Sequence, residues 1–141
     1  MLCCFSVNIT RALLDSDFLG TSSIEIVIDT GMPDGIKSPE MLEAIERLAE
    51  NLTRRYPDLV VGTYSLGNLV KETYESLNDG TADMYRIPDE FEELAQTLLI
   101  VESEDYERFE QLVSLDYSFT RLRVNFKNPG SNRAVGLVQE I

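Results

Sequence analysis

Apolar and polar side chains alternate in two stretches of the chain, the pattern of a β-strand with one buried face. Residues 23–29, read SIEIVID, place an isoleucine at every second position. Residues 118–126, read SFTRLRVNF, repeat the alternation with threonine, leucine, valine and phenylalanine. The apolar run over residues 59–66 predicts a third strand between them.

Helical spacing of apolar residues predicts a long helix over residues 39–55. Ser38 can cap its first turn, Pro39 suits the first helical position, and Pro57 stops the chain beyond it. Its apolar stripe consists of Met41, Leu42, Ile45, Leu48, Ala49 and Leu52.

Further helices are expected over residues 69–77, from Pro88 onward, over residues 105–112, and over residues 131–141 after a Ser131 cap. Gly67-Asn68 is expected to separate the strand before it from the first of these. The apolar residues expected to face the core are Phe91, Leu94, Ala95, Leu98 and Leu99 in the helix after Pro88, and Tyr106, Phe109, Leu112 and Val113 after it.

The predicted order is strand, helix, strand, helical insertion, strand, helix, which is typical of an α+β domain with a ferredoxin-like split βαβ arrangement. That arrangement requires a fourth strand, and none is predicted after the last helix. We therefore expect a fragment truncated before its last strand, unless the apolar start of the chain supplies the missing edge. Residues 1–17 are a poorly defined N-terminal segment, and residues 18–141 are the α+β domain.

Charge and composition restrict the function. The chain has 141 residues, 43% of them hydrophobic, and a net charge of −13. This length suits one domain with a real core, and the charge disfavours nucleic-acid partners and anionic membrane surfaces. The longest apolar run, residues 98–101, is far shorter than the roughly 18 residues of a membrane span. Cys3 and Cys4 are adjacent, so they do not form a disulfide framework.

Asp29-Thr30-Gly31 invites the hypothesis of an aspartic protease, in which two carboxylates share one proton. A chain of this size would supply one aspartate and would need a dimer. Met32-Pro33 replaces the small residue usual after this tripeptide, and the rest of the chain is largely helical. The sequence favours a turn at the end of a strand, with Gly31 chosen for its backbone.

The other motifs also favour structural interpretations. Asn78-Asp79-Gly80 with Asp83 suggests a calcium loop, but Arg86 stands where the last glutamate ligand belongs. The acidic runs over residues 89–93 and 102–105 fit solvated helix faces. The chain has no histidine to activate a serine or bind a metal. We therefore assign no catalytic, cofactor-binding or metal-binding residue, expect no cofactor and expect no enzyme activity.

Several segments in order resemble a periplasmic loop of the resistance–nodulation–division (RND) superfamily of exporters, in the branch of the MMPL and Patched-like lipid transporters. The segments are residues 23–31, Pro33-Asp34-Gly35-Ile36-Lys37, Tyr64-Ser65-Leu66 with Leu69-Val70-Lys71-Glu72, Leu77-Asn78-Asp79-Gly80, Tyr85-Arg86-Ile87-Pro88-Asp89, Ala95-Gln96, and Asp116-Tyr117-Ser118. The resemblance covers about residues 18 to 141.

The resemblance implies a porter domain on the extracytoplasmic, periplasmic side of the plasma membrane, between two spans of a proton-driven exporter of lipid-like or hydrophobic compounds. Its partners would be the remainder of the exporter chain and its membrane spans, a hydrophobic substrate, or further copies in a homo-oligomer. The proton-coupling carboxylates of such exporters lie within the membrane, so this segment alone would not transport. The alternative is a free-standing soluble binding or adaptor domain.

Gly31 provides a test of the turn interpretation. Gly31→Val should destabilise the fold by roughly 1–3 kcal/mol, because a β-branched residue resists positive φ. Asp29→Asn should cost much less, since the turn interpretation gives its charge no catalytic role. Urea unfolding of both variants measures the difference, and a greater loss for Asp29→Asn would contradict the turn interpretation.

Overall fold

The computed structural model describes residues 8–16 and 21–127, with side chains from residue 23 onward. It is a mixed α+β fold. In chain order its elements are β1 (Asn8–Ser16), β2 (Thr21–Asp29), α1 (Pro39–Arg55), β3 (Val60–Tyr64), α2 (Leu66–Leu77), the 3-10 turn η1 (Ala82–Met84), α3 (Phe91–Glu104), α4 (Tyr106–Leu112) and β4 (Phe119–Lys127).

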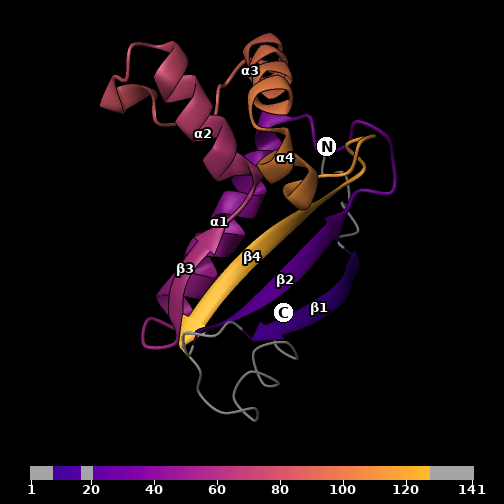
Figure 1. The fold of residues 1–141 in the computed structure, drawn as a ribbon, viewed down its shortest axis with the longest axis vertical. Helices are drawn as coiled ribbons and strands as arrows, with labels where there is room; N and C mark the ends of the chain where they lie inside the picture. Colours follow the sequence, from indigo (N-terminus) through magenta and orange to yellow (C-terminus); the bar gives the residue numbers. More distant parts are fainter. Residues whose placement is uncertain (1–7, 17–20, 128–141) are drawn as a thin grey trace.

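The strands form one antiparallel sheet in the order β1-β2-β4-β3 (Figure 1). The unit β2-α1-β3 is split, because β4 lies between its two strands. The pairing of β2 with β4 runs without interruption from Thr21↔Lys127 to Asp29↔Phe119. The central pair of the sheet therefore joins segments about a hundred residues apart in sequence.

The described sheet has four strands, so the expectation that its last strand is missing is wrong. Strand β1 pairs with β2 from Asn8↔Asp29 to Ser16↔Ser22, with one irregularity between Ile9 and Ala12. The alternative stated above holds in this respect, because Asn8–Ser16, near the start of the chain, supplies this edge. The helix predicted over residues 131–141 lies outside the described residues.

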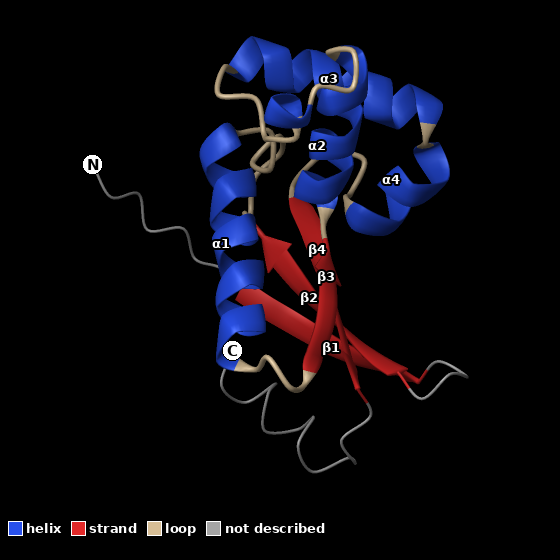
Figure 2. Cartoon of the chain, turned by 90° about the vertical axis from the view of Figure 1, so that its left-hand side faces the viewer, coloured by secondary structure: helices blue, strands red, loops and turns tan. Residues whose placement is uncertain are grey.

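Helix α1 lies along one face of the sheet, while α2, α3 and α4 gather at one end of it (Figure 2). The alternation predicted for the two central strands is confirmed. Ile24, Ile26 and Ile28 are buried, as are Thr120, Leu122, Val124 and Phe126 on β4. This inward face, together with the apolar stripe of α1, builds the main core.

The start of α1 confirms the predicted cap. The Ser38 hydroxyl accepts a hydrogen bond of 3.1 Å from the Met41 amide, and Pro39 is the first helical residue. Helix α2, in contrast, begins at Leu66, three residues earlier than predicted. Asn68 therefore lies in the first turn of α2 and does not precede it. Its Oδ1 accepts a 2.9 Å bond from the Ser65 amide, which completes a capping box.

The predicted apolar faces of α3 and α4 are partly wrong. Leu94 and Leu98 are buried, but Phe91 is 59% exposed and Leu99 is 66% exposed. In α4 the prediction holds for Phe109 and Leu112, whereas Tyr106 is 46% exposed. Helical spacing correctly identified the helices, but it overestimated the width of the face that each one buries.

Gly35 should be less tolerant of a side chain than its sequence suggests. A Cβ there would lie 2.1 Å from the Thr30 Oγ1 and 2.5 Å from the Thr30 Cβ. Gly35→Ala should therefore cost about 1–3 kcal/mol of unfolding free energy, since either the Thr30 side chain or the backbone at residue 35 has to move. Urea unfolding measures the loss.

Gly62→Ala is the matched control for Gly35→Ala, because a Cβ at Gly62 meets no atom within 4 Å. It should change the unfolding free energy by less than about 1 kcal/mol. Equal stability of the two variants would show that the close approach of Gly35 to Thr30 does not constrain the fold.

Candidate functional site

Two loops meet at the end of the central strands. The loop of residues 30–37 leaves β2, and the loop of residues 114–118 leads into β4. The predicted positive φ of Gly31 is confirmed at +71°. Asp29 Oδ1 accepts a 2.8 Å bond from the Gly31 amide, so this carboxylate supports the local turn.

Backbone bonds fasten the two loops together. The Thr30 amide donates to the Ser118 carbonyl at 2.9 Å, the Asp34 amide to Asp116 at 2.8 Å, and the Ile36 amide to Tyr117 at 3.0 Å. The Thr30 hydroxyl adds a 2.7 Å bond to the Ser118 carbonyl. The Asp-Thr-Gly segment is thus joined to residues 88 positions further along the chain.

Tyr117 lies at the centre of this junction. Its backbone is left-handed, with φ of 55°, which is an outlier for a bulky residue. Its buried ring packs 5.5 Å from the Phe109 ring and lies 4.2 Å from Lys37 Nζ. Its hydroxyl donates to Glu102 on α3 at 3.2 Å. Burial, reinforced by the Glu102 carboxylate, raises the pKa of the Tyr117 phenol above its usual range.

Hydrogen bonds hold Asp116, beside Tyr117, in place. Its Oδ1 accepts bonds from the hydroxyls of Ser118 at 2.7 Å and Ser114 at 2.8 Å, and from the Ser118 amide at 3.1 Å. These donors, with the Ser118 hydroxyl first, lower the pKa of the Asp116 carboxyl below its ordinary value. The loop therefore presents a fixed negative charge at the surface.

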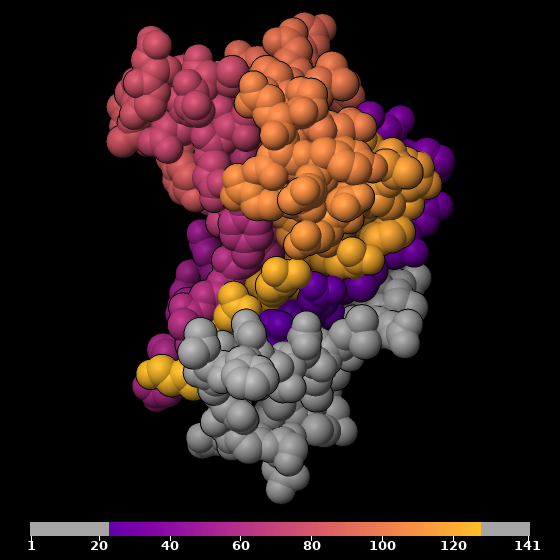
Figure 3. Space-filling model, in the orientation of Figure 1, coloured from indigo at the N-terminus to yellow at the C-terminus, as the bar shows by residue number. Residues whose placement is uncertain are grey.

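A groove of about 440 Å³ lies where α4 approaches the start of β4. Its apolar part includes Tyr106, Leu115 and Phe119, and its charged part includes Glu110, Asp116 and Arg121. In the space-filling view the surface of α4 adjoins that of the loop leading into β4 (Figure 3). We call this the α4–β4 groove, and it is the candidate binding site.

A second groove, of about 400 Å³, lies between α1, α2 and β3. Most of its lining residues are polar or charged types, among them Thr53, Ser65 and Asn68. Lys71 on α2 pairs with Glu46 on α1, and its ammonium lies 5.0 Å from the centre of the Tyr85 ring. The Lys71–Glu46 pair therefore links the two helices across this groove.

The residues of the calcium-loop motif and of the first acidic run make hydrogen bonds and ion pairs within the fold. Asp79 and Gly80 have positive φ, and the Gly80 amide donates to the Glu75 carbonyl at 2.9 Å, which ends α2. Asp89 pairs with Arg86 at 2.8 Å, and Glu93 accepts a 3.1 Å bond from Tyr74.

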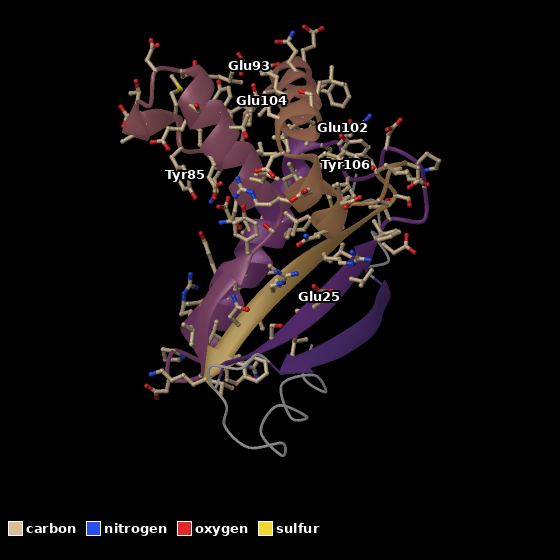
Figure 4. All side chains as sticks on the ribbon, in the orientation of Figure 1. Glu25, Tyr85, Glu93, Glu102, Glu104 and Tyr106 are labelled. Atoms are coloured by element: carbon tan, nitrogen blue, oxygen red, sulfur yellow. The ribbon has the colours of Figure 1, made fainter. Side chains whose placement is uncertain are left out.

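Glu93, Glu102 and Glu104 all come from α3, at the helical end of the molecule, with Tyr106 on α4 nearby (Figure 4). Across residues 8–16 and 21–127, no group of three or more acidic, cysteine or histidine side chains is arranged to hold a metal ion. Within the same ranges, no helix combines the length and apolar character that a membrane span requires.

No family model, curated protein or solved structure matches this chain.

Sequence reasoning missed the α4–β4 groove. Among the sequence motifs Asp116 appears only within the resemblance and Leu115 appears in none, yet Leu115 is 73% exposed and Asp116 is a fixed carboxylate. A signal was present in Ser114-Leu115-Asp116-Tyr117-Ser118, since two serines around an aspartate favour a tight, hydrogen-bonded turn.

Ser118 should control the ionisation of Asp116. Ser118→Ala removes the strongest donor to this carboxylate and should raise the Asp116 pKa toward its ordinary value, as carboxyl NMR titration would detect. Because the pKa of the folded state is lowered, the stabilisation is present above the unfolded pKa and is lost as the pH falls through the folded value.

Ser118→Thr keeps the hydroxyl and should keep the lowered pKa of Asp116. A titration that is identical in the wild-type chain and in Ser118→Ala would show that the Ser118 hydroxyl does not stabilise the ionised carboxylate.

Proposed function

We propose that this chain is an extracytoplasmic, porter-type domain of a proton-driven RND exporter for lipid-like or hydrophobic compounds, of the MMPL and Patched-like branch. It contributes to substrate passage and assembly and does not transport by itself. Its partners are the remainder of the exporter chain and its membrane spans, with a hydrophobic substrate or further copies as additional ligands.

The sheet order carries this proposal. A split βαβ unit with β4 between β2 and β3, and a further antiparallel strand beside β2, has the strand arrangement expected of a ferredoxin-like porter subdomain. The long helical insertion between β3 and β4 lies where the order of predicted elements places one. We therefore propose that the fold is ferredoxin-like.

The alternative is a free-standing binding or adaptor domain. Two features of the core favour it. Strand β1 covers the edge of β2, and within the described residues no buried side-chain nitrogen or oxygen lacks a hydrogen-bond partner. The protease hypothesis loses its main motivation, because Asp29 supports the local turn and Thr30 fastens that turn to the loop of residues 114–118.

Membrane topology tests the exporter proposal. The parent reading frame should encode hydrophobic spans before Met1 and after Ile141. In that full protein, with Cys3 and Cys4 changed to serine, Leu99→Cys should react with a membrane-impermeant thiol reagent in intact cells. Leu99 is 66% exposed, so a cysteine there is accessible once the domain lies outside the plasma membrane.

Val124→Cys is the matched control, because Val124 is fully buried and should stay unlabelled until the protein is denatured. Labelling of Leu99→Cys only after cell lysis would contradict the extracytoplasmic location. A reading frame without flanking spans would contradict the exporter assignment and leave the adaptor alternative.

A further inference from the structure

The α4–β4 groove combines an apolar wall with a rigid backbone. Leu115 is 73% exposed and Tyr106 is 46% exposed, so both form the rim of the groove rather than its floor. Val113, which also lines the groove, is buried in the core. Only a ligand that lies across the rim from outside would remove Leu115 and Tyr106 from water.

The loop that carries Leu115 and Asp116 is already ordered. Ser114 Oγ accepts bonds of 3.1 Å from the amides of both Ser118 and Phe119. The left-handed backbone of Tyr117 is a sparsely populated conformation, and such outliers concentrate at ligand-binding sites. A preorganised loop loses little conformational freedom when it binds, which favours recognition of a partner.

The charges of the groove are not balanced internally. Arg121 donates to the Gln111 carbonyl at 3.0 Å and lies 5.8 Å from the centre of the Phe119 ring. Glu110 and Asp116 have no ion-pair partner in the described part of the chain. Ser114 and Ser118 donate to Oδ1 of Asp116, so Oδ2 retains its capacity to accept. An occupant with a cation would complement these two carboxylates.

We infer that the α4–β4 groove docks a peptide segment of a partner protein in which a lysine or arginine is flanked by apolar side chains. The apolar neighbours cover Leu115, Tyr106 and Phe119, and the cation pairs with Asp116 and Glu110. Anionic lipid headgroups are disfavoured by the same carboxylates and by the net charge of −13. This goes beyond the exporter proposal, because the groove belongs to the domain whether or not the chain lies between membrane spans.

Selection from a random dodecapeptide display library on the full 141-residue chain tests the inference. The selected peptides should be enriched in lysine or arginine next to leucine, isoleucine or phenylalanine. Fluorescence anisotropy of one synthesised peptide should show weakening of about tenfold for Leu115→Ala, through lost apolar burial. Asp116→Asn should weaken binding about fivefold, and high salt should remove that difference.

Leu99→Ala and Asp83→Asn are the matched controls, because both residues are exposed and neither lines the groove. They should bind the peptide like the wild-type chain, and circular dichroism should show that all four variants are folded. Failure to enrich cationic peptides, or equal binding by Leu115→Ala and wild type, overturns the inference. Leu115-dependent self-association or binding to phosphatidylcholine vesicles, without peptide binding, overturns it in favour of a second copy or a lipid.

Discussion

The structure depends on one contact, the antiparallel junction where β2 ends and β4 begins. The ladder between these strands closes with Asp29↔Phe119, and the Thr30 amide then continues it by bonding to Ser118. Residues 30–37 lead directly into α1, and residues 114–118 follow directly after α4. The position of α1 on the sheet and that of the helical insertion at its end are therefore both set at this junction.

The strain at Tyr117 is offset by the contacts that the same residue makes. A left-handed backbone at a bulky residue costs on the order of 1–3 kcal/mol. The tilted ring pair with Phe109 contributes about 0.5–1.5 kcal/mol and the Lys37 contact about 0.5–2 kcal/mol. Because Phe109, Lys37 and Glu102 come from α4, the 30–37 loop and α3, Tyr117 ties three parts of the chain to the sheet.

Sequence patterns correctly predicted the features that depend on residues close together in the chain. Period-two alternation identified the buried faces of β2 and β4, and the Ser38-Pro39 signal identified the start of α1, since each depends on residues close in sequence. Non-local packing decided the rest. Nothing near Phe91 or Leu99 indicates that the remaining helices leave them uncovered, and the partnership of β1 with β2 depends on which edge of the sheet is vacant. The α4–β4 groove could not be predicted, because it forms only when α4 meets a loop that the junction holds in place.

The two grooves differ in a way that bears on binding. Between α1 and α2, Lys71 is already paired with Glu46 and covered by Tyr85, so that groove uses its charges to hold helices together. Single exposed apolar side chains, such as Leu99, are ordinary on protein surfaces. Tyr106, Leu115 and Phe119 are different, because they converge on one groove beside two carboxylates that have no ion-pair partner in the described residues. Apolar surface and unbalanced charge thus coincide beside a loop that several hydrogen bonds hold in place, which is the arrangement that recognition of a complementary partner requires.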